Sequence, residues 1–160
     1  MTCSISLEND ISCFGANDGS ATVVPVGGTP GFTFLWDDGQ ITATAVGLTP
    51  GLHTVTVTDM NGCATDCEIT IQEPLEFTCT VDLVNNVLCA GDTNGSATAV
   101  PSNGIAPFTF LWDNGEVTAT AIALTGGSHT VTITDATNCT TVCEIEIMDQ
   151  STLELSLIHI

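Results

Sequence analysis

The sequence predicts an all-β protein made of two tandem β-sandwich domains that are stapled by disulfides. Three observations lead to this fold class. Short stretches alternate polar and apolar residues with period two, turn-forming residues separate these stretches, and eight cysteines are spread over two similar halves. Several short strands with turns about every 8–12 residues are typical of a sandwich, and no stretch has a convincing helical period.

The two halves are copies of one unit, offset by 76 residues as Cys3 and Cys79 show. Between residues 3–74 and 79–150, 38 of the 72 aligned positions are identical without a gap. We therefore expect repeat 1 to span residues 1–75, repeat 2 to span residues 76–150, and a tail to cover residues 151–160. A linker of a few residues, around 73–78, leaves the two domains limited freedom.

In the first unit the expected strands cover residues 21–26, 32–36, 42–48, 53–59 and 67–71. Threonine and valine dominate them, as suits a pleated surface with one buried face. The strands are separated by segments rich in the residues that favour turns, which are NDG, GGTPG, DDG, TPG and MNG. The dipeptides Asp38-Gly39 and Asn114-Gly115 supply positive φ and are typical of hairpins.

The charge of the chain excludes several classes of function. Lysine and arginine are absent, while 19 aspartates and glutamates give a formal charge of −19. Without a cation to neutralise phosphate, the chain has no means of binding nucleic acid or an anionic membrane surface. Enzymes that clamp phosphates or carboxylates with Arg or Lys are excluded as well. The chain also offers trypsin no cleavage site, and its net charge makes it repel itself.

Eight cysteines, an even number, indicate an oxidising extracellular setting. The first residues have neither the basic nor the apolar region of a secretion signal. No apolar run is long enough to insert into a membrane. We expect a secreted natural product, of which this chain is a fragment or a processed form.

One series of residues resembles a known family. CFGANDGSATVVPVGGTPGFTFLWDDG, then LTPGLHTVTVTDMNGC, and the second copy that begins CAGDTNGSATAVP are similar to the SprB repeat. That family builds very large cell-surface adhesins of gliding Bacteroidetes from modules that resemble immunoglobulin-like sandwiches of the PKD type. The resemblance implies surface display, tandem repetition, an adhesive or structural role and no catalysis.

The chain departs from the family pattern at three kinds of position. Phenylalanine replaces the family's usual tyrosine at Phe32, Phe34, Phe108 and Phe110. Histidine replaces it at His53 and His129. A second pair of cysteines is additional in each unit: Cys3 with Cys67, and Cys79 with Cys143.

Four cysteines per unit allow three pairings, and the residues alone do not choose among them. The resemblance implies a pair Cys13–Cys63, which leaves Cys3–Cys67. In the second unit it implies Cys89–Cys139 and Cys79–Cys143. A zinc site formed by the Cys-x3-Cys spacing and a histidine is the rival hypothesis.

Two sets of side chains have a structural and a functional interpretation. His53 shares the parity of its aliphatic neighbours, so we expect it and His129 to bond nearby backbone, as a tyrosine often does in immunoglobulin-like sandwiches. A catalytic histidine beside Asp59 or Asp135 is the alternative. Phe32, Phe34 and Trp36 alternate and are expected to face the core, the alternative being an exposed strip on which glycans stack.

The acidic side chains in the turns are the most plausible functional residues of the chain, as ligands of a metal ion. Carboxylates and amides in turns are oxygen ligands of the kind that calcium prefers, although none of the turns reproduces an EF-hand loop. The candidates are Asp18, Asp37, Asp38, Asp59, Asp92, Asn94, Asp113 and Asp135, and solvated turn carboxylates are the simpler interpretation. Two sequons mark possible glycosylation at Asn94 and Asn138.

The last ten residues, STLELSLIHI, depart from the repeat pattern. They fit the start of a third repeat, a sequencing scar at 155–160, or a strand that pairs with a neighbouring subunit.

Together the features of the whole sequence favour a non-enzymatic extracellular module that builds a cell-surface stalk, fibril or filament by homopolymerisation or concatenation. A carbohydrate-binding adhesin module and an accessory domain of a secreted enzyme are the alternatives.

Overall fold

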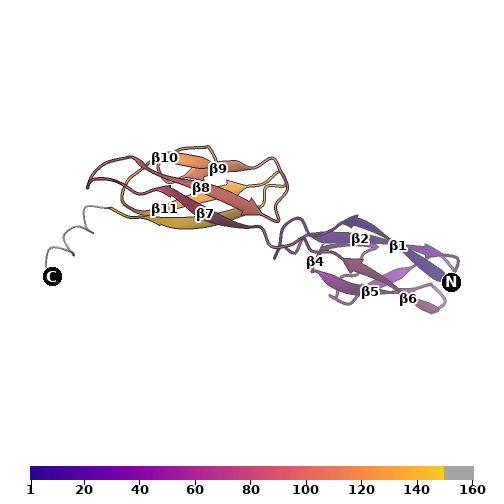
Figure 1. The fold of residues 1–160 in the computed structure, drawn as a ribbon. Helices are drawn as coiled ribbons and strands as arrows, with labels where there is room; N and C mark the ends of the chain where they lie inside the picture. Colours follow the sequence, from indigo (N-terminus) through magenta and orange to yellow (C-terminus); the bar gives the residue numbers. More distant parts are fainter. Residues whose placement is uncertain (150–160) are drawn as a thin grey trace. The chain divides into compact units, whose positions relative to one another are not determined.

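The computed structural model describes residues 1–149, which form two separate units (Figure 1). The first unit is Met1–Pro74, and the second begins at Leu75. The division therefore falls one residue before the boundary expected from the repeat. The tail at residues 151–160 lies outside the described residues.

The first unit contains six strands in two antiparallel sheets. They are β1 (Thr2–Asn9), β2 (Gly19–Val26), β3 (Thr33–Trp36), β4 (Thr44–Leu48), β5 (Gly51–Thr58) and β6 (Ala64–Ile71). One sheet has the order β1-β2-β4 and the other the order β3-β5-β6. The chain crosses between the two sheets three times, so neither sheet is continuous in sequence.

The second unit repeats this arrangement strand for strand. Its strands are β7 (Thr78–Asn85), β8 (Gly95–Ser102), β9 (Thr109–Trp112), β10 (Thr120–Leu124), β11 (Gly127–Thr134) and β12 (Thr140–Ile147). Its sheets have the orders β10-β8-β7 and β12-β11-β9. The same bulge interrupts the first ladder of each unit, between Leu7 and Asn9 and between Leu83 and Asn85.

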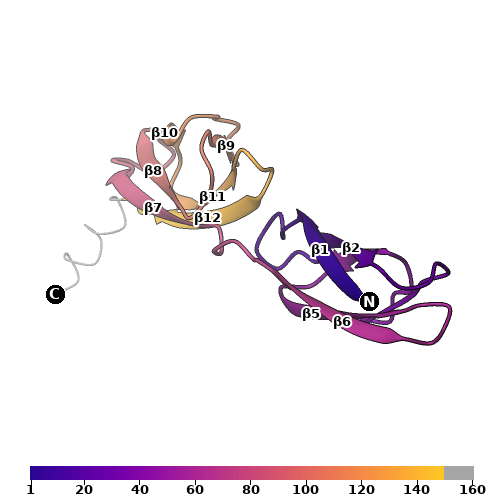
Figure 2. The same cartoon turned by 90° about the vertical axis from the view of Figure 1, so that its right-hand side faces the viewer.

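Each unit is a two-layered β-sandwich, which confirms the expected fold class. Figure 2 shows β1 and β2 in one layer of the first unit and β5 and β6 in the other. The six strands correspond to strands A, B, C, E, F and G of an immunoglobulin-like sandwich, with sheets ABE and CFG and without strand D. No helix among residues 1–149 has the length and apolar character needed to span a membrane.

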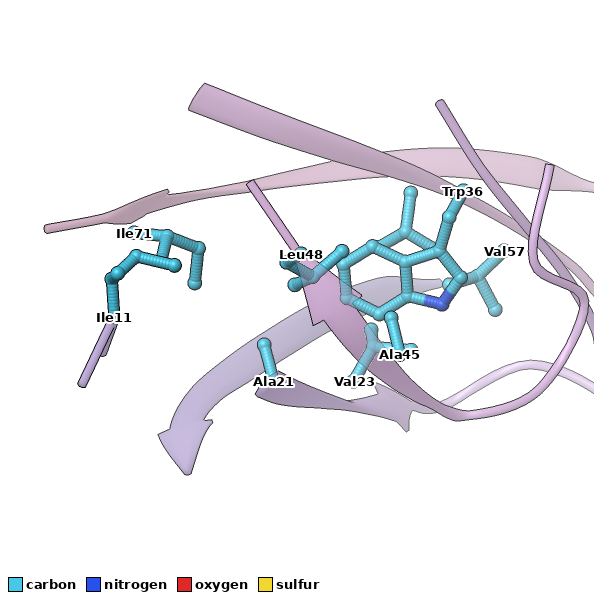
Figure 3. Close-up of a cluster of buried hydrophobic side chains, with 9 residues drawn as sticks. Ile11, Ala21, Val23, Trp36, Ala45, Leu48, Val57 and Ile71 are labelled. Carbon is cyan, nitrogen blue, oxygen red and sulfur yellow. The ribbon is translucent and has the colours of Figure 1, made fainter. Parts of the chain in front are cut away.

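The core of each unit is built around one tryptophan between the two sheets. Trp36 is 2% exposed and lies among Ala21, Val23, Ala45 and Leu48 (Figure 3). Its indole Nε1 donates to the Thr42 carbonyl at 2.9 Å, so the one polar atom of the ring is satisfied. The equivalent Trp112 donates to Thr118 in the same way.

Two details of the sequence-based prediction are corrected by the structure. The expected strands do not include β1 or its copy β7, although Cys3, Ile5 and Leu7 alternate with polar residues. The turn at Asp38-Gly39 is tight, with Gly39 N donating to Trp36 O at 3.0 Å and a φ of 90° at Gly39. It does not join a hairpin, because β3 pairs with β5 while β4 pairs with β2.

Candidate functional site: the poles of each unit and their cysteines

Each unit has two poles, which carry its loops. We call the N pole of unit 1 the end formed by loop 27–31 and turn 59–63, where β1 and β6 both begin. The C pole is formed by loop 10–18 and residues 72–73, where β1 and β6 both finish. The hydrogen bond from Ile11 N to Gln72 O at 3.0 Å holds the C pole together.

A buried carboxylate organises the N pole. Asp59 Oδ1 accepts hydrogen bonds from the backbone N–H groups of Asn61 and Cys63, both at 2.9 Å, and Oδ2 accepts one from Thr29 at 3.0 Å. The bonds from Thr29 and Cys63 lower the pKa of the Asp59 carboxyl below its ordinary value. One side chain therefore fixes both segments of the pole that carries Cys63.

The N pole of unit 2 is built in the same way. Asp135 Oδ1 accepts from the backbone of Thr137 and Cys139, and Oδ2 accepts from Ile105 N at 3.0 Å. Burial opposes ionisation of this carboxyl, but the hydrogen bonds from Ile105 and Thr137 outweigh it and lower its pKa. The Asp-x3-Cys spacing is thus a turn motif that repeats with the unit.

The C pole is fixed by two further carboxylates. Asp18 accepts from Ser12 N at 3.0 Å and from the Ser12 hydroxyl, and these bonds lower the Asp18 pKa. Glu73 Oε1 accepts from Gly15 N at 2.8 Å, which ties the loop to the end of the unit. Cys13 lies between these two anchor points.

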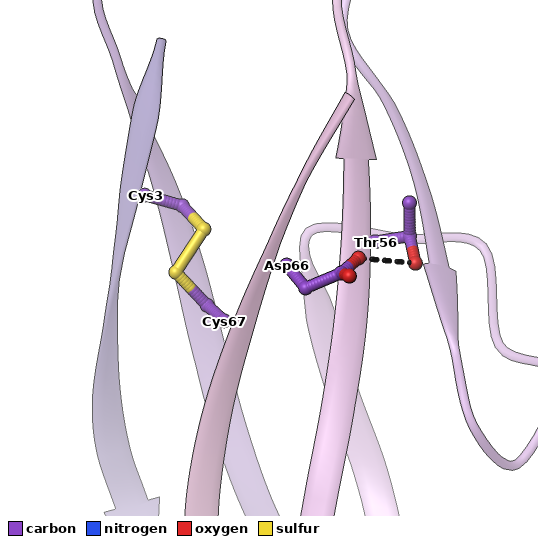
Figure 4. Close-up of a disulfide and its surroundings, with 4 residues drawn as sticks. All are labelled: Cys3, Thr56, Asp66 and Cys67. Atoms are coloured by element: carbon purple, nitrogen blue, oxygen red, sulfur yellow. Dashed lines mark hydrogen bonds between the residues drawn. A yellow bond between two sulfur atoms is a disulfide. The ribbon is translucent and has the colours of Figure 1, made fainter.

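The structure forms two of the four expected disulfides. Cys3 in β1 bonds to Cys67 in β6, with the two Cα atoms 6.1 Å apart (Figure 4), and Cys79 bonds to Cys143 in the same way. Since β1 and β6 are edge strands of different sheets, the bond joins the two layers of the sandwich. Beside it, the Thr56 hydroxyl donates to Asp66 at 2.8 Å.

The other two expected disulfides, Cys13–Cys63 and Cys89–Cys139, are not formed. Cys63 and Cys89 are exposed free thiols, while Cys13 and Cys139 are disulfide-bonded. The physical reason is distance within the unit, because Cys63 precedes β6 and Cys13 lies beside the residues that follow it. Eight extended residues span about 26 Å, whereas a disulfide requires Cα atoms about 4.4–6.8 Å apart.

The two buried histidines have the structural role that the sequence predicts. His53 is 6% exposed, and its Nε2 donates to the Thr49 carbonyl at 2.9 Å, the position of the tyrosine corner of immunoglobulin-like sandwiches. Its Nδ1 lies 3.1 Å from Asp37 Oδ1, a partner that the sequence analysis missed. Burial opposes protonation of His53, but the hydrogen bonds to Thr49 and Asp37 outweigh it and raise its pKa.

In the second unit the same residues resemble a catalytic triad. His129 Nδ1 lies 3.0 Å from Asp113, and its Nε2 lies 3.3 Å from the hydroxyl of Thr125. The same Nε2 also bonds the Thr125 carbonyl at 3.1 Å, and a carbonyl oxygen can only accept. Nε2 therefore carries a proton and cannot remove one from the hydroxyl, so this geometry does not fit a nucleophile and its base.

The aromatic side chains face the core, as expected. Phe32 and Phe34 are half-buried and pack against the cluster around Trp36, while Thr33 and Leu35 on the other face are exposed. In unit 2, Phe108 stacks on Phe77 with ring centroids 5.9 Å apart. An aromatic strip for glycan stacking is therefore not displayed at these positions.

Most of the candidate metal ligands already have protein partners. Within residues 1–149 no three His, Cys, Asp or Glu side chains come together as a metal site, which applies to zinc as well as to calcium. Seven of the eight candidates accept hydrogen bonds from neighbouring residues, and Asp92 lies exposed in a loop. Those seven are Asp18, Asp37, Asp38, Asp59, Asn94, Asp113 and Asp135.

Both sequons lie in exposed loops of the second unit. Asn94 accepts from Leu88 N at 3.4 Å and takes the place of Asp18 at the C pole. Asn138 has a φ of 66° in the turn before Cys139. Glycosylation at these two positions remains a prediction.

Comparison with known proteins identifies the repeat. The SprB repeat model matches residues 9–41 and 83–117, once in each unit. A search of curated protein sequences finds no match.

Two solved structures are similar at low identity. The C-terminal 282-residue fragment of intimin, in complex with the intimin-binding domain of its translocated receptor, has a TM-score of 0.44 and 15% identity. The match covers 91% of this chain but 63% of that fragment, so the chain spans less than two thirds of its length. The fibronectin(III)-like modules of Clostridium thermocellum CbhA match at a TM-score of 0.30 and 18% identity, over 92% of this chain and 96% of that one.

The family match falls on the same segments in both units, from the end of the first strand through the C-pole loop and the tryptophan strand to the turn after it. These segments hold Cys13, Cys89 and the two aromatic strands, while Cys63 and Cys139 lie outside the matched ranges. The chain carries two SprB repeats, one in each unit.

Proposed function

We propose that this chain is an extracellular structural module, a building block of a cell-surface stalk, fibril or filament. The observation that carries the proposal is the way the chain runs through each unit. It begins at the N pole with β1 and finishes at the C pole after β6, and β7 to β12 repeat the path. A unit of this kind can be concatenated without a connection that turns back, as in other linear arrays.

The repeat family, the disulfides and the composition of the chain support an extracellular location. SprB repeats are found in surface adhesins, and disulfides such as Cys3–Cys67 persist in oxidising compartments. The absence of lysine and arginine removes trypsin-type cleavage sites from a chain exposed to proteases. The two buried histidines bond nearby backbone carbonyls and neighbouring carboxylates of the fold.

Electron microscopy of the native material tests the proposal. Negative staining should show filaments with a longitudinal repeat of one or two units. A uniform population of isolated monomers at the native concentration would count decisively against it. Because the net charge is −19, the measurement should be made at physiological ionic strength, where charges more than about 8 Å apart are screened.

A further inference from the structure

Four cysteines lie at the poles, and they occupy two repeat-equivalent positions. Cys13 and Cys89 hold the C-pole position, while Cys63 and Cys139 hold the N-pole position. At each position one cysteine is disulfide-bonded and its equivalent is a free thiol. Cys139 is bonded and 8% exposed, whereas Cys63 is exposed and free.

The backbone around each free thiol is held as it is around the bonded cysteine at the equivalent position. Asp59 holds the turn of Cys63 with the same backbone bonds by which Asp135 holds the turn of Cys139. In unit 2 the C pole is formed by loop 86–94 and the residues after β12. Cys89 lies in this loop, which the bond from Val87 N to Met148 O at 3.1 Å ties to the end of β12. Both positions are therefore built for a disulfide, and Cys63 and Cys89 lack only a partner.

Neither thiol can find that partner inside its own unit. β12 separates Cys139 from the C pole of unit 2 just as β6 separates Cys63 from the C pole of unit 1, by about 26 Å of strand. A C-pole cysteine meets an N-pole cysteine only where the C pole of one unit faces the N pole of another.

We propose that Cys89 of one copy of this chain forms a disulfide with Cys63 of the next copy, which joins the chains head to tail. The inference rests on the proposed role as a module of a linear array and supplies the bond between its modules. It also explains how so acidic a chain could stay assembled. Two copies with a charge of −19 each repel one another, and a covalent bond holds where noncovalent end-to-end contact is opposed.

The reaction needs an oxidant, and a low-molecular-weight disulfide such as oxidised glutathione is sufficient. The Cys89 thiolate attacks one sulfur of the oxidant, forming a mixed disulfide and releasing one thiol. The Cys63 thiolate of a second copy then attacks the Cys89 sulfur and releases the second thiol. Two protein thiols are oxidised to one disulfide, and one oxidant disulfide is reduced to two thiols.

Two single variants of the full chain give a sharp test. Cys63→Ser keeps only the C-pole thiol, and Cys89→Ser keeps only the N-pole thiol. Since both side chains are exposed, serine at these positions should leave the fold intact, which circular dichroism can verify. With oxidised glutathione, wild type should give a ladder of oligomers on non-reducing gels, and each variant alone should stay monomeric. An equimolar mixture of the two variants should give a dimer and nothing longer.

Mapping by pepsin digestion identifies the bond, since trypsin has no site. The proposal expects a cross-linked peptide that contains Cys63 and Cys89. It is overturned if either variant alone dimerises as fast as the mixture, because the thiols would then react by chance collision. It is also overturned if wild type stays monomeric while an alkylating reagent still labels both thiols.

Microscopy of Cys63→Ser/Cys89→Ser separates this inference from the proposed function. Short or sparse filaments from this variant, against long ones from wild type, support the covalent link. Filaments of wild-type length that survive denaturing detergent equally well overturn the link, while the proposed structural role stands. Monomers from wild type as well as from the variant would contradict the structural role itself.

Discussion

The disulfide between Cys3 and Cys67 should carry much of the stability of the first unit. It closes a loop with a sequence separation of 64 between the edge strands of the two sheets. The chain-entropy relation gives a loss of about 14 cal/mol/K for a loop of this size, which is about 4 kcal/mol at room temperature. A domain of this length has a total free energy of unfolding of roughly 4–11 kcal/mol. Replacing both cysteines with alanine should therefore remove a large share of it.

Denaturation of the full chain measures this loss, because each unit contains one tryptophan. With 5-fluorotryptophan incorporated, Trp36 and Trp112 report the two units as separate fluorine NMR resonances. If the denaturant slope is about 2 kcal/mol/M in guanidinium chloride, the Trp36 midpoint should fall by about 2 M in Cys3→Ala/Cys67→Ala.

A matched control is available in the second unit. Cys79 and Cys143 also have a sequence separation of 64, so Cys79→Ala/Cys143→Ala should lower the Trp112 midpoint equally and leave Trp36 unaffected. A fall below about 0.5 M in the Trp36 midpoint would refute the loop-entropy reasoning. An equal shift of both resonances in either variant would refute the treatment of the units as independent.

Three other outcomes are expected for the same chain. Gly19→Ala should lower the free energy of unfolding by about 1–3 kcal/mol, since a Cβ would lie 2.7 Å from Ile71 Cγ2 and 3.0 Å from Leu48 O; an unchanged urea midpoint would contradict this. The raised pKa of His53 means that the folded state holds its proton more tightly than the unfolded state. The stabilisation that protonated His53 gives the folded state is complete below the ordinary pKa of about 6.5 and is lost as pH rises through the raised pKa. The melting temperature, measured over a pH series, should fall in that range, and His53→Gln should remove this fall. A calcium chelator should leave the melting temperature unchanged, because seven of the eight candidate side chains already accept protein hydrogen bonds; a fall of several degrees would restore the calcium hypothesis.

Local patterns predicted what depends on one strand at a time. The alternation of Phe32, Phe34 and Trp36 assigns these side chains to the core, because successive residues of a strand face opposite sides. The parity of His53 with Val55 and Val57 likewise placed it inside, where a buried nitrogen needs a backbone acceptor. No knowledge of strand order is needed for either conclusion.

Strand order decided what the sequence left open. Asp37 and His53 are 16 residues apart, and they meet because β3 pairs with β5 in a register that sets Trp36 opposite Val55. The Asp38-Gly39 turn suggests a hairpin, yet the chain passes to the other sheet there, since β4 completes the ladder of β2. Turn chemistry fixes the local bend, while the core decides which sheet receives the next strand.

Cysteine pairing depends on both strand order and the length of a strand. Cys3 and Cys67 meet because β1 and β6 begin at the same pole and run side by side at the sheet edges. Cys13 and Cys63 are the pair that the family resemblance implies, and one strand length holds them at opposite poles. In each unit the additional pair is the disulfide that joins the two sheets. Cys63 and Cys89 at the poles are the residues that we propose link one copy of the chain to the next.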